Sequence, residues 1–379
     1  GQDDLGFDGD SFVITNSGQV LARSPQFVEN LLIADVEVAQ STTRGEQPGH
    51  GVAVIEAGNG HPARAGRPVL EATAPVRTED DREQIWNALV LGLKDYVTKN
   101  AFPSVILGLS GGIDSAVCAT IAVDAIGPER VFGVSMPSVY SSEHSRSDAD
   151  DLAQRLGVHM RTEAIAELVS PVETQLKLNS VAAENLQARI RGIILMGLSN
   201  AEGHLVLTTG NKTEIAVGYS TIYGDSVGGF APIRDVPKTL VWELARWRNE
   251  WAVDRGETPP IPENSITKPP SAELRPDQVD QDSLPEYDVL DALLELYITQ
   301  RQGREDVIAA GFDAEMVDRV ISLVDRAEWK RRQGAIGPKI SEMAFGRDRR
   351  LPVTFTRTEH AFGCCTQARA HTPFCAGKS

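Results

Sequence analysis

The stretch S-V-I-L-G-L-S-G-G-I-D-S, residues 104–115, decides the fold of this chain. Its first half is an apolar run typical of a buried strand. Gly111 and Gly112 then allow a turn too tight for larger side chains. An apolar-periodic helix follows and is expected to run to about Ile126. A strand, a small-residue turn and a helix N-terminus direct several backbone N–H groups at one point, so the segment predicts an anion site suited to a polyphosphate.

Side chains of the same loop suit this ligand. Ser110 and Ser115 add hydroxyl donors, and Asp114 supplies a hard oxygen ligand for Mg²⁺ beside the phosphates. The loop is not G-x-x-x-x-G-K-[ST], because no lysine follows the glycines, and its spacing does not fit G-x-G-x-x-G. It resembles the S-G-G-x-D-S loop of the ATP-pyrophosphatases, which cleave ATP to AMP and pyrophosphate. A plain strand-to-helix turn is the alternative interpretation.

Composition narrows the class of protein. A chain of 379 residues can form one large domain or two modest ones. Its 37 basic and 53 acidic residues give a formal charge of −16, which argues against broad binding of nucleic acid or membrane surfaces. The sequence holds no apolar run of transmembrane length and no signal peptide. Its 4 cysteines are too few for a disulfide framework, so we expect a cytoplasmic protein.

The ends of the chain differ from its middle. Residues 1–39 hold three strand-like runs, Phe12–Ile14, Val20–Ala22 and Leu31–Val36, with a hairpin turn at Asn16-Ser17-Gly18. Residues 40–77 are rich in Gly, Pro, Ser and Thr and predict a linker.

Residues 357–379 predict a disordered tail. The tail contains residue types that bind metals, so a metal site is the alternative interpretation, although two adjacent cysteines give poor geometry for zinc. The potential metal ligands are Cys364, Cys365, His371 and Cys375.

Residues 78–356 predict one α/β domain. Strand candidates at 104–109, 131–136, 158–162 and 204–209 alternate with helices, which indicates a parallel sheet covered on both faces. The ligand should lie at the carboxyl ends of the strands, with an adenine ring near Met136-Pro137. Helices are also expected after a Thr78 cap and over residues 142–156, 287–299 and 314–324.

Further polar residues are expected at this sheet edge. Thr209 and Glu214 follow the fourth strand, and a second carboxylate beside Asp114 suits a metal that bridges ATP phosphates. Residues 183–200 predict a helix whose arginines, Arg189 and Arg191, are either solvated or ligand-binding. Its apolar stripe consists of Leu186, Ile190, Ile193, Ile194 and Leu198.

Five motifs then occur in the order found in NAD synthetases: S-G-G-I-D-S, E-N-L-Q-A-R, T-G-N-K-T-E, G-Y-S-T-I-Y-G-D and K-P-P-S-A-E-L. The chain resembles this family from about Thr78 to Arg350, and G-Q-D-D-L-G-F-D-G-D-S-F near its start resembles the tail of a nitrilase-like glutaminase domain. The resemblance implies an adenine nucleotide alpha hydrolase-like fold, usually assembled as a homo-oligomer. It also implies an activity: ATP adenylates the nicotinate carboxylate of deamido-NAD, pyrophosphate leaves, and ammonia displaces AMP to give NAD.

The resemblance also implies a set of site residues. Asp114 and Glu214 would bind Mg²⁺, and Lys238 would neutralise phosphate charge, which makes Asp114 and Lys238 the catalytic pair. The ATP site would comprise Gly108, Leu109, Ser110, Gly111, Gly112, Ile113, Asp114, Ser115, Thr209, Lys238 and Ser271. The deamido-NAD site would comprise Asn185, Arg189, Glu214 and Lys330. Ile222 and Gly229 stand where ammonia-dependent bacterial enzymes carry charged ligand-binding residues, so contacts in that loop stay open.

The positions of the cysteines predict which nitrogen donor the chain uses. The glutaminase cysteine would lie before Gly1, and the first cysteine present, Cys118, is expected in the core. We therefore expect this chain to use ammonia and not glutamine, whereas a full-length parent would use both. We also expect a lid over Glu263–Pro285. The alternatives are another ATP-pyrophosphatase, such as GMP synthetase or a tRNA-modifying ligase, or a non-catalytic remnant. Pyrophosphate release with ATP and deamido-NAD separates them.

Overall fold

The computed structural model describes residues 2–36, 79–271, 273–275 and 278–354. The chain divides into two compact units, Gly1–Phe7 with Asp81–Ser379, and Asp8–Asp80. The predicted linker and the predicted tail with its cysteines lie outside the described residues. The domain boundaries expected from the sequence therefore stay a prediction.

The described part of the smaller unit, residues 8–36 and 79–80, contains a hairpin. Strands β1 (Phe12–Ile14) and β2 (Val20–Arg23) pair antiparallel, which confirms the first two predicted strands. Gly18 adopts a φ of +87° in the turn, a conformation that favours glycine. The third predicted strand, Leu31–Val36, is wrong. Leu31 is 81% exposed, and none of the described strands pairs with this run, so its apolar pattern has no sheet to join.

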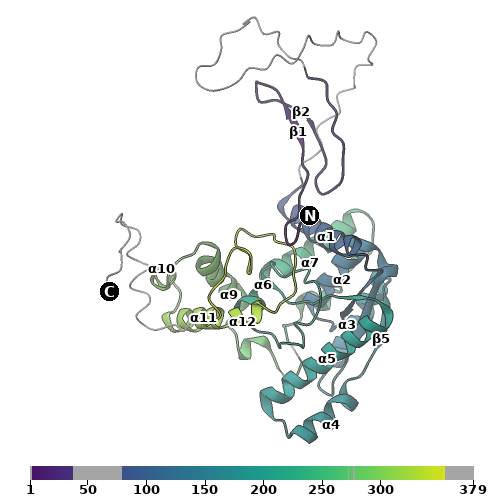
Figure 1. The fold of residues 1–379 in the computed structure, drawn as a ribbon, viewed down its shortest axis with the longest axis vertical. Helices are drawn as coiled ribbons and strands as arrows, with labels where there is room; N and C mark the ends of the chain where they lie inside the picture. Colours follow the sequence, from purple (N-terminus) through teal and green to yellow (C-terminus); the bar gives the residue numbers. More distant parts are fainter. Residues whose placement is uncertain (1, 37–78, 272, 276–277, 355–379) are drawn as a thin grey trace, which may run out of the picture. The chain divides into compact units, whose positions relative to one another are not determined.

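The larger unit is built on a four-stranded parallel sheet, as predicted (Figure 1). Its strand order is β5-β4-β3-β6, and β3, which leads into the glycine loop, lies between β4 and β6. The last strand is shorter than predicted, because Leu207 leaves the ladder and pairs with Phe230 through an isolated bridge. The strands are β3 (Val105–Gly108), β4 (Val131–Ser135), β5 (His159–Thr162) and β6 (Leu205–Val206).

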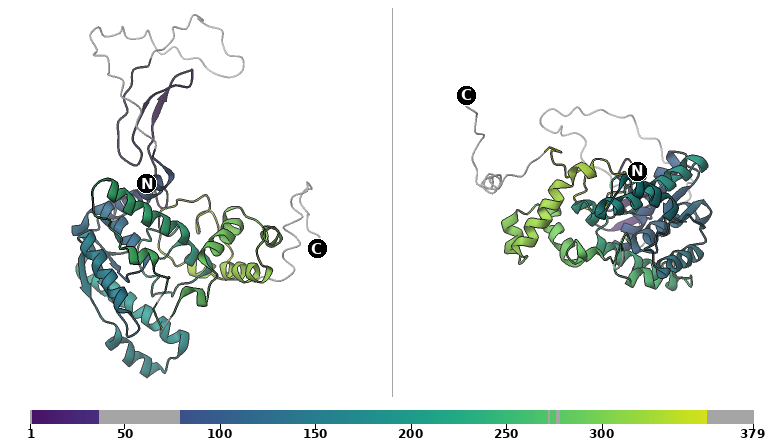
Figure 2. Two further views of the ribbon diagram at one scale, coloured as in Figure 1. Left: turned by 180° about the vertical axis from the view of Figure 1, so that it is seen from behind. Right: turned by 90° about the horizontal axis from the view of Figure 1, so that it is seen from below.

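Helices cover both faces of this sheet (Figure 2). Alternation along β3 explains the two layers: Val105 and Leu107 enter one core, and Ile106 enters the other. The first core is closed by α1 (Asp81–Lys99), α2 (Ile113–Ile126), α3 (Glu143–Leu156) and α7 (Lys238–Asp254). The second core is closed by α4 (Ala166–Leu176) and α5 (Ser180–Glu202). Cys118 is fully buried in the first core, as predicted.

A second helical cluster follows the sheet and has its own apolar core. The predicted helix at residues 287–299 is confirmed as α9 (Tyr287–Leu294), continued by a π-helical turn, η3 (Glu295–Thr299). The one predicted at 314–324 is α11 (Ala314–Arg326). The shorter elements are η1 (Pro128–Arg130), α6 (Lys212–Val217), α8 (Glu263–Thr267), η2 (Asp280–Asp282), α10 (Arg304–Ala309) and α12 (Glu328–Arg331).

Two details of the predicted helices change. Helix α1 begins at Asp81, and the expected Thr78 cap lies outside the described residues. On α5, Leu186, Ile190 and Leu195 are buried, but Ile193 is 63% exposed and does not belong to the buried stripe. Ile193 lies two positions before Leu195, about 200° around the helix, so it faces away from the sheet.

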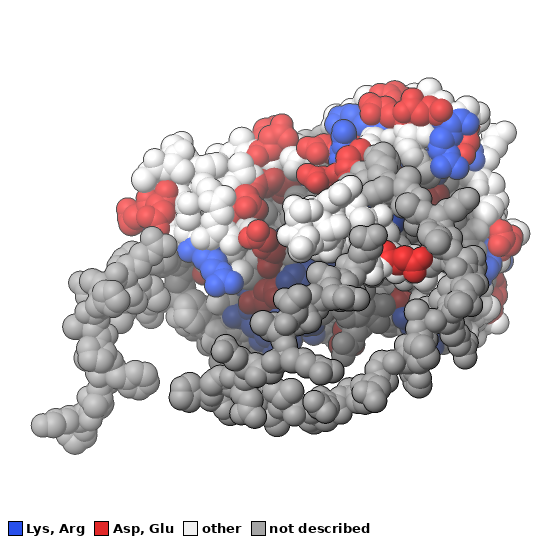
Figure 3. Space-filling model, turned by 90° about the horizontal axis from the view of Figure 1, so that it is seen from above, with Lys and Arg blue, Asp and Glu red and all other residues white. Residues whose placement is uncertain are grey.

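The described surface is mainly acidic where it is visible. Asp and Glu side chains cover more of the face in Figure 3 than Lys and Arg do, in keeping with the formal charge of −16. Among the described residues, no helix combines the length and the apolar character needed to cross a membrane.

Candidate active site

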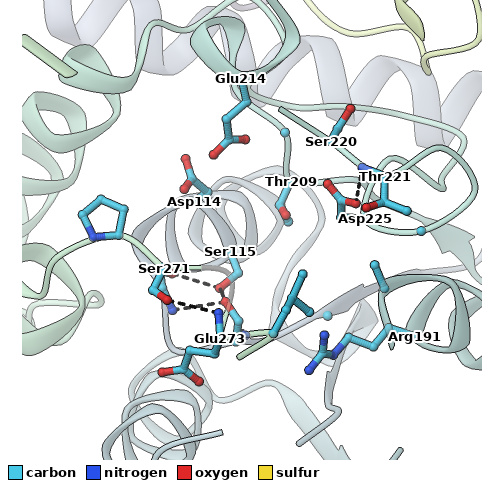
Figure 4. A pocket seen from close by; sticks show the side chains of 18 of the residues that line it. Asp114, Ser115, Arg191, Thr209, Glu214, Ser220, Thr221, Asp225, Ser271 and Glu273 are labelled. Carbon is cyan, nitrogen blue, oxygen red and sulfur yellow. Dashed lines mark hydrogen bonds between the residues drawn. The ribbon is translucent and has the colours of Figure 1, made fainter. Parts of the chain in front are cut away.

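A pocket of about 1010 Å³ opens at the carboxyl ends of the central strands (Figure 4). It is bounded by the loop after β3, the end of β4, the segment after β6, helix α5 and described residues of the segments 268–271, 273–275 and 278–283. Most predicted site residues line it, whereas Gly111 and Arg189 do not. Those that line it are Gly108, Leu109, Ser110, Gly112, Ile113, Asp114, Ser115, Asn185, Thr209, Glu214, Lys238, Ser271 and Lys330.

The loop after β3 is held by its own serines. Ser115 Oγ donates to the carbonyl of Gly112 at 2.9 Å, and Ser110 Oγ accepts from the Gly112 N–H at 3.2 Å. Gly112 is the N-cap of α2 and has no side chain to cap the helix. The first N–H groups of α2 therefore face the pocket mouth with the positive end of the helix dipole, which is the arrangement that binds phosphate.

Gly111 has a structural role in this loop. Its φ is +77°, and a Cβ added there would lie 2.4 Å from the carbonyl oxygen of Ser145 on α3. No other residue can take this position without moving α3. Gly111 thus lets α3 approach the loop closely, although it does not itself line the pocket.

Two carboxylates converge at the pocket floor. Asp114 lies at the start of α2 and Glu214 at the start of α6, and their side chains point toward one another (Figure 4). Asn211 fixes both: its Nδ2 donates to Asp114 Oδ1 at 3.0 Å, and its Oδ1 accepts from the Glu214 N–H at 3.0 Å. The Glu214 carboxylate in turn accepts from the Asn211 N–H at 3.3 Å, which completes a capping box.

Lys238 lies between these carboxylates. Its Nζ donates to Asp114 Oδ2 and lies 3.7 Å from Glu214 Oε1, while its side chain is only 2% exposed. The ammonium also lies 5.5 Å from the ring centroid of Trp242 and 5.3 Å from that of Tyr287. Burial disfavours its charge, but Asp114 and Glu214 outweigh burial and raise the pKa of Lys238.

Charge at this site is unbalanced. Burial, reinforced by the Asp114 carboxylate and opposed by Lys238, raises the pKa of Glu214 to about 8. Asp280 is a third carboxylate on the pocket wall, where burial raises its pKa; it accepts from the Tyr287 hydroxyl at 2.7 Å and the Tyr219 hydroxyl at 3.3 Å. One lysine thus faces three acids, and a divalent cation with a polyphosphate would change this balance.

The donor set at this floor fits one class of metal ion. Among the described residues, no group of three or more His, Cys, Asp or Glu side chains could enclose an ion by itself. Two carboxylates at a phosphate loop suit Mg²⁺, which keeps several waters and takes its remaining ligands from phosphate oxygens. Asp114 and Glu214 could hold such an ion only if Lys238 moved from its present contact with Asp114.

The opposite wall comes from the predicted lid. Ser271 Oγ accepts from the Glu273 N–H at 3.1 Å, and the Glu273 carboxylate accepts from Ser145 Oγ at 2.5 Å. Lys268 Nζ lies 3.0 Å from the same carboxylate. These contacts join Lys268 and Glu273 to Ser145 in the first turn of α3. Whether this segment moves as a lid stays a prediction.

Of the residues expected to bind deamido-NAD, all except Arg189 line the pocket. Asn185 lines the pocket and accepts from Thr221 Oγ1 at 2.6 Å. Lys330 also lines it, with its ammonium 2.7 Å from each of the carbonyls of Gly218 and Ser220. Arg189 is exposed outside the lining and donates to the carbonyl of Ile222 at 3.2 Å.

Arg191 points into the pocket instead (Figure 4). Its Nε donates to the carbonyl of Met136 at 3.1 Å, and burial lowers its pKa. Neither Ile222 nor Gly229 lines the pocket. A Cβ on Gly229 would lie 2.7 Å from Leu205 Cδ1, so a side chain there would require Leu205 to move.

Several lining or supporting residues were not expected from the sequence. The role of Asn211 could have been found, because N-x-x-E before an apolar run signals a capping box. Arg191 lines the pocket and Arg189 does not, because of how α5 is rotated about its axis on the sheet. The periodicity of the sequence does not determine this rotation. Lys268 and Glu273 lie in irregular backbone and Asp280 begins the short helix η2, so none of them carried a signal of periodicity.

Comparison with known proteins places the chain among relatives of one kind. A family model described as NAD synthase matches residues 85–334. The glutamine-dependent NAD(+) synthetase of Acinetobacter baylyi is 49% identical, with 93% of this chain and 61% of that protein aligned. The glutamine-dependent NAD+ synthetase of Acinetobacter baumannii, solved in complex with ADP, is 45% identical with a TM-score of 0.57 and covers 93% of this chain and 60% of that one. The NH3-dependent NAD synthetase of Campylobacter jejuni is 27% identical with a TM-score of 0.53 and covers 65% of this chain and 94% of that one.

Proposed function

Because the chain belongs to the NAD synthase family, we propose that its pocket binds ATP and deamido-NAD and makes NAD by ATP-dependent amidation. The chain spans 61% of the length of the Acinetobacter baylyi relative, so its activity is inferred from its own site together with the family. The observation that carries the proposal is the pairing of Asp114 and Glu214 around Lys238 beside the phosphate loop.

The reaction proceeds in two displacements. A nicotinate carboxylate oxygen of deamido-NAD attacks the α-phosphorus of ATP, the bond from that phosphorus to the bridging oxygen breaks, and pyrophosphate leaves. Ammonia then attacks the acyl carbon, the carbon–oxygen bond breaks, AMP leaves, and the added nitrogen loses a proton to give the amide. No side chain need act as a nucleophile, so the protein supplies positioning, charge stabilisation and exclusion of water.

The residues of this chain divide these tasks. The loop at Gly108–Ser115 binds the phosphates through backbone N–H groups and serine hydroxyls. Lys238 neutralises charge that builds up between the attacking carboxylate and the polyphosphate. Asp114 and Glu214 would hold Mg²⁺, which when bound withdraws charge from the phosphate oxygens. Thr209 and Ser271 lie on the wall beside this loop and offer hydroxyl donors to ATP.

The nicotinate dinucleotide is assigned to the wall formed by α5 and α12. Asn185 and Lys330 line that wall, and the guanidinium of Arg191 adds a buried cation beside them. Arg189 stays a candidate because it lies one turn from Asn185 on α5, although it faces outward from this pocket.

Ammonia is the nitrogen donor that we assign to this chain. The region matched by the Campylobacter jejuni structure, described as NH3-dependent, corresponds to nearly the whole of that protein. Cys118, the cysteine among the described residues, is fully buried in the core, so it cannot serve as the nucleophile of a glutaminase.

Assembly and compartment extend the proposal. We assign a homo-oligomer formed through the α/β unit, because α5 exposes large apolar side chains to solvent; these are Val181, Ile193 and Met196. A cytoplasmic location is supported by the free thiol of Cys118, which suits a reducing compartment.

Release of pyrophosphate tests the function. The protein is mixed with ATP and Mg²⁺, and deamido-NAD and ammonium chloride are added separately and together. We expect pyrophosphate and NAD in equal amounts when all components are present. Turnover with xanthosine monophosphate or with a tRNA in place of deamido-NAD would assign the chain to another ATP-pyrophosphatase. Absence of turnover with every acid would mean that the chain is not catalytic.

A further inference from the structure

Helix α9 carries an acid that joins the two helices bearing Glu214 and Lys238. Asp291 lies outside the large pocket, on the far side of α6. Helices α6, α7 and α9 pack against one another in pairs. No part of the proposed mechanism uses Asp291, and the sequence motifs above do not include it.

The Asp291 carboxylate accepts hydrogen bonds from two helices. Its Oδ1 accepts from Thr213 Oγ1, and its Oδ2 accepts from the N–H of Thr239 at 2.8 Å and from Thr239 Oγ1 at 2.9 Å. Thr213 Oγ1 in turn accepts from the N–H of Lys238 at 2.9 Å. One carboxylate therefore links residue 213 of α6 with residues 238 and 239 of α7.

These contacts substitute for a missing helix cap. Pro237 is the N-cap residue of α7 and has no side chain that can accept a hydrogen bond. The first two N–H groups of α7 are satisfied by Thr213 Oγ1 and Asp291 Oδ2 instead. A carboxylate at the N-terminus of α7 also interacts favourably with the positive end of the helix dipole.

The helices that Asp291 joins carry the charged groups of the site. Thr213 directly precedes Glu214, and Lys238 is the first residue of α7. Helix α6 has only 6 residues, so its own hydrogen bonds hold it weakly and its direction depends on its neighbours. The relative position of the two helix starts that carry Glu214 and Lys238 is thus held by contacts that meet at one carboxylate.

We propose that Asp291 is a positioning residue for the reaction, which holds the helix starts that carry Glu214 and Lys238 in the relative position needed to bind metal–ATP. This inference rests on the proposed function for its kinetic part. It also makes a claim about binding that does not require turnover. Groups outside the ligand shell commonly change metal affinity or activity by about 10- to 100-fold when removed.

The variant Asp291→Asn tests this role with little change in shape. Its amide cannot accept all three hydrogen bonds, so the anchor to either Thr213 or Thr239 weakens. Thr213 and Asp291 line a cleft of about 550 Å³. Water in this cleft can form a hydrogen bond with a donor that loses its contact with residue 291. We therefore expect the variant to fold.

Asp288→Asn is the matched control. Asp288 lies one turn earlier on the same helix and is exposed, so it loses the same charge without losing this anchor. We expect Asp291→Asn to raise the half-saturating Mg²⁺ concentration and to lower kcat, each by about tenfold or more, with the KM for deamido-NAD within about twofold of wild type. For Asp288→Asn, the half-saturating Mg²⁺ concentration, kcat and the KM for deamido-NAD should all stay within about twofold of wild type.

A binding measurement separates this inference from the proposed function. Calorimetry with Mn²⁺ and α,β-methylene-ATP should show at least about tenfold weaker binding by Asp291→Asn than by Asp288→Asn. Thr213→Val should give the same loss, and the double variant should lose little more than either single one, because both break one link. If Asp291→Asn does not fold, Thr213→Val alone decides.

Equal binding by the Asp291→Asn, Thr213→Val and Asp288→Asn variants would overturn the positioning role, whether or not the wild type makes NAD. Wild-type protein that binds the metal–nucleotide but makes no NAD would overturn the proposed function and leave the binding comparison intact. A loss confined to thermal stability, with unchanged Mg²⁺ dependence, would reduce Asp291 to a structural cap.

Discussion

Glu214 should cost the unliganded protein stability at neutral pH. Its pKa rises from 4.5 to about 8 on folding, mainly because it is buried beside Asp114. Between these two values the folded chain binds more protons at this site than the unfolded chain does. The free energy of unfolding must therefore fall as pH rises, by up to about 1.4 kcal/mol per pH unit for a single fully responding group. Below about pH 4.5 this contribution is fully present, and above about pH 8 it is lost.

The variant Glu214→Gln removes this dependence while keeping the shape of the protonated acid. Its amide oxygen can still accept from the Asn211 N–H, which is 3.3 Å from the carboxylate. Because Asp114 and Lys238 share the response, we expect a gain in stability of about 1 to 3 kcal/mol at pH 7.5 and of less than about 1 kcal/mol at pH 5. Activity should be lost at every pH, because the amide is a poor ligand for Mg²⁺.

Urea unfolding at pH 5.0, 6.5 and 7.5 measures this difference. Asp280 also has a raised pKa, but it is present in both proteins and its effect largely cancels in the comparison. Parallel stability profiles for wild type and Glu214→Gln would refute the reasoning, because they would mean that Glu214 is ionised in the folded state over the whole range.

Three further substitutions test the site. Asp114→Ala should lower pyrophosphate release by at least about a hundredfold with little change in the urea midpoint, because removing the Asp114 charge lets Glu214 ionise as the counter-charge of Lys238; wild-type AMP formation would contradict this. Lys238→Ala should lower kcat by about a hundredfold and change the KM for deamido-NAD far less; an effect on KM alone would assign the lysine to ground-state binding. Gly111→Ala should destabilise the protein by at least about 1 kcal/mol and weaken ATP binding, because its φ is +77° and its Cβ would meet Ser145; unchanged ATP affinity by calorimetry would argue against this packing.

Local patterns were enough to predict the centre of the fold. The apolar run before Gly111 and the periodic helix after it became β3 and α2, and the alternation of strands and helices became a four-stranded parallel sheet. The carboxyl-edge rule placed Asp114 and Glu214 in one pocket although they are far apart in sequence. Each of these inferences uses a property of one segment or a general rule of topology.

What could not be predicted depends on how elements pack. The run Leu31–Val36 has the composition of a strand but pairs with none of the described strands, and its composition alone does not determine whether it pairs. The orientation of α5 on the sheet decides that Arg191 and not Arg189 lines the pocket. The contact between Lys238 and Asp114 joins two helix starts through space, so no spacing in the sequence indicates its closeness.

Transfer of oxygen from substrate to AMP tests the central claim most directly. Deamido-NAD labelled with ¹⁸O in the nicotinate carboxylate is supplied with ATP, Mg²⁺ and ammonium chloride, and the products are examined by mass spectrometry, with glutamine in ammonia-free buffer as a parallel reaction. We expect one ¹⁸O atom in each AMP, none in pyrophosphate, and NAD only when ammonium is present. Unlabelled AMP would contradict adenylation of the carboxylate in this pocket, and NAD formed from glutamine would contradict ammonia as the direct donor.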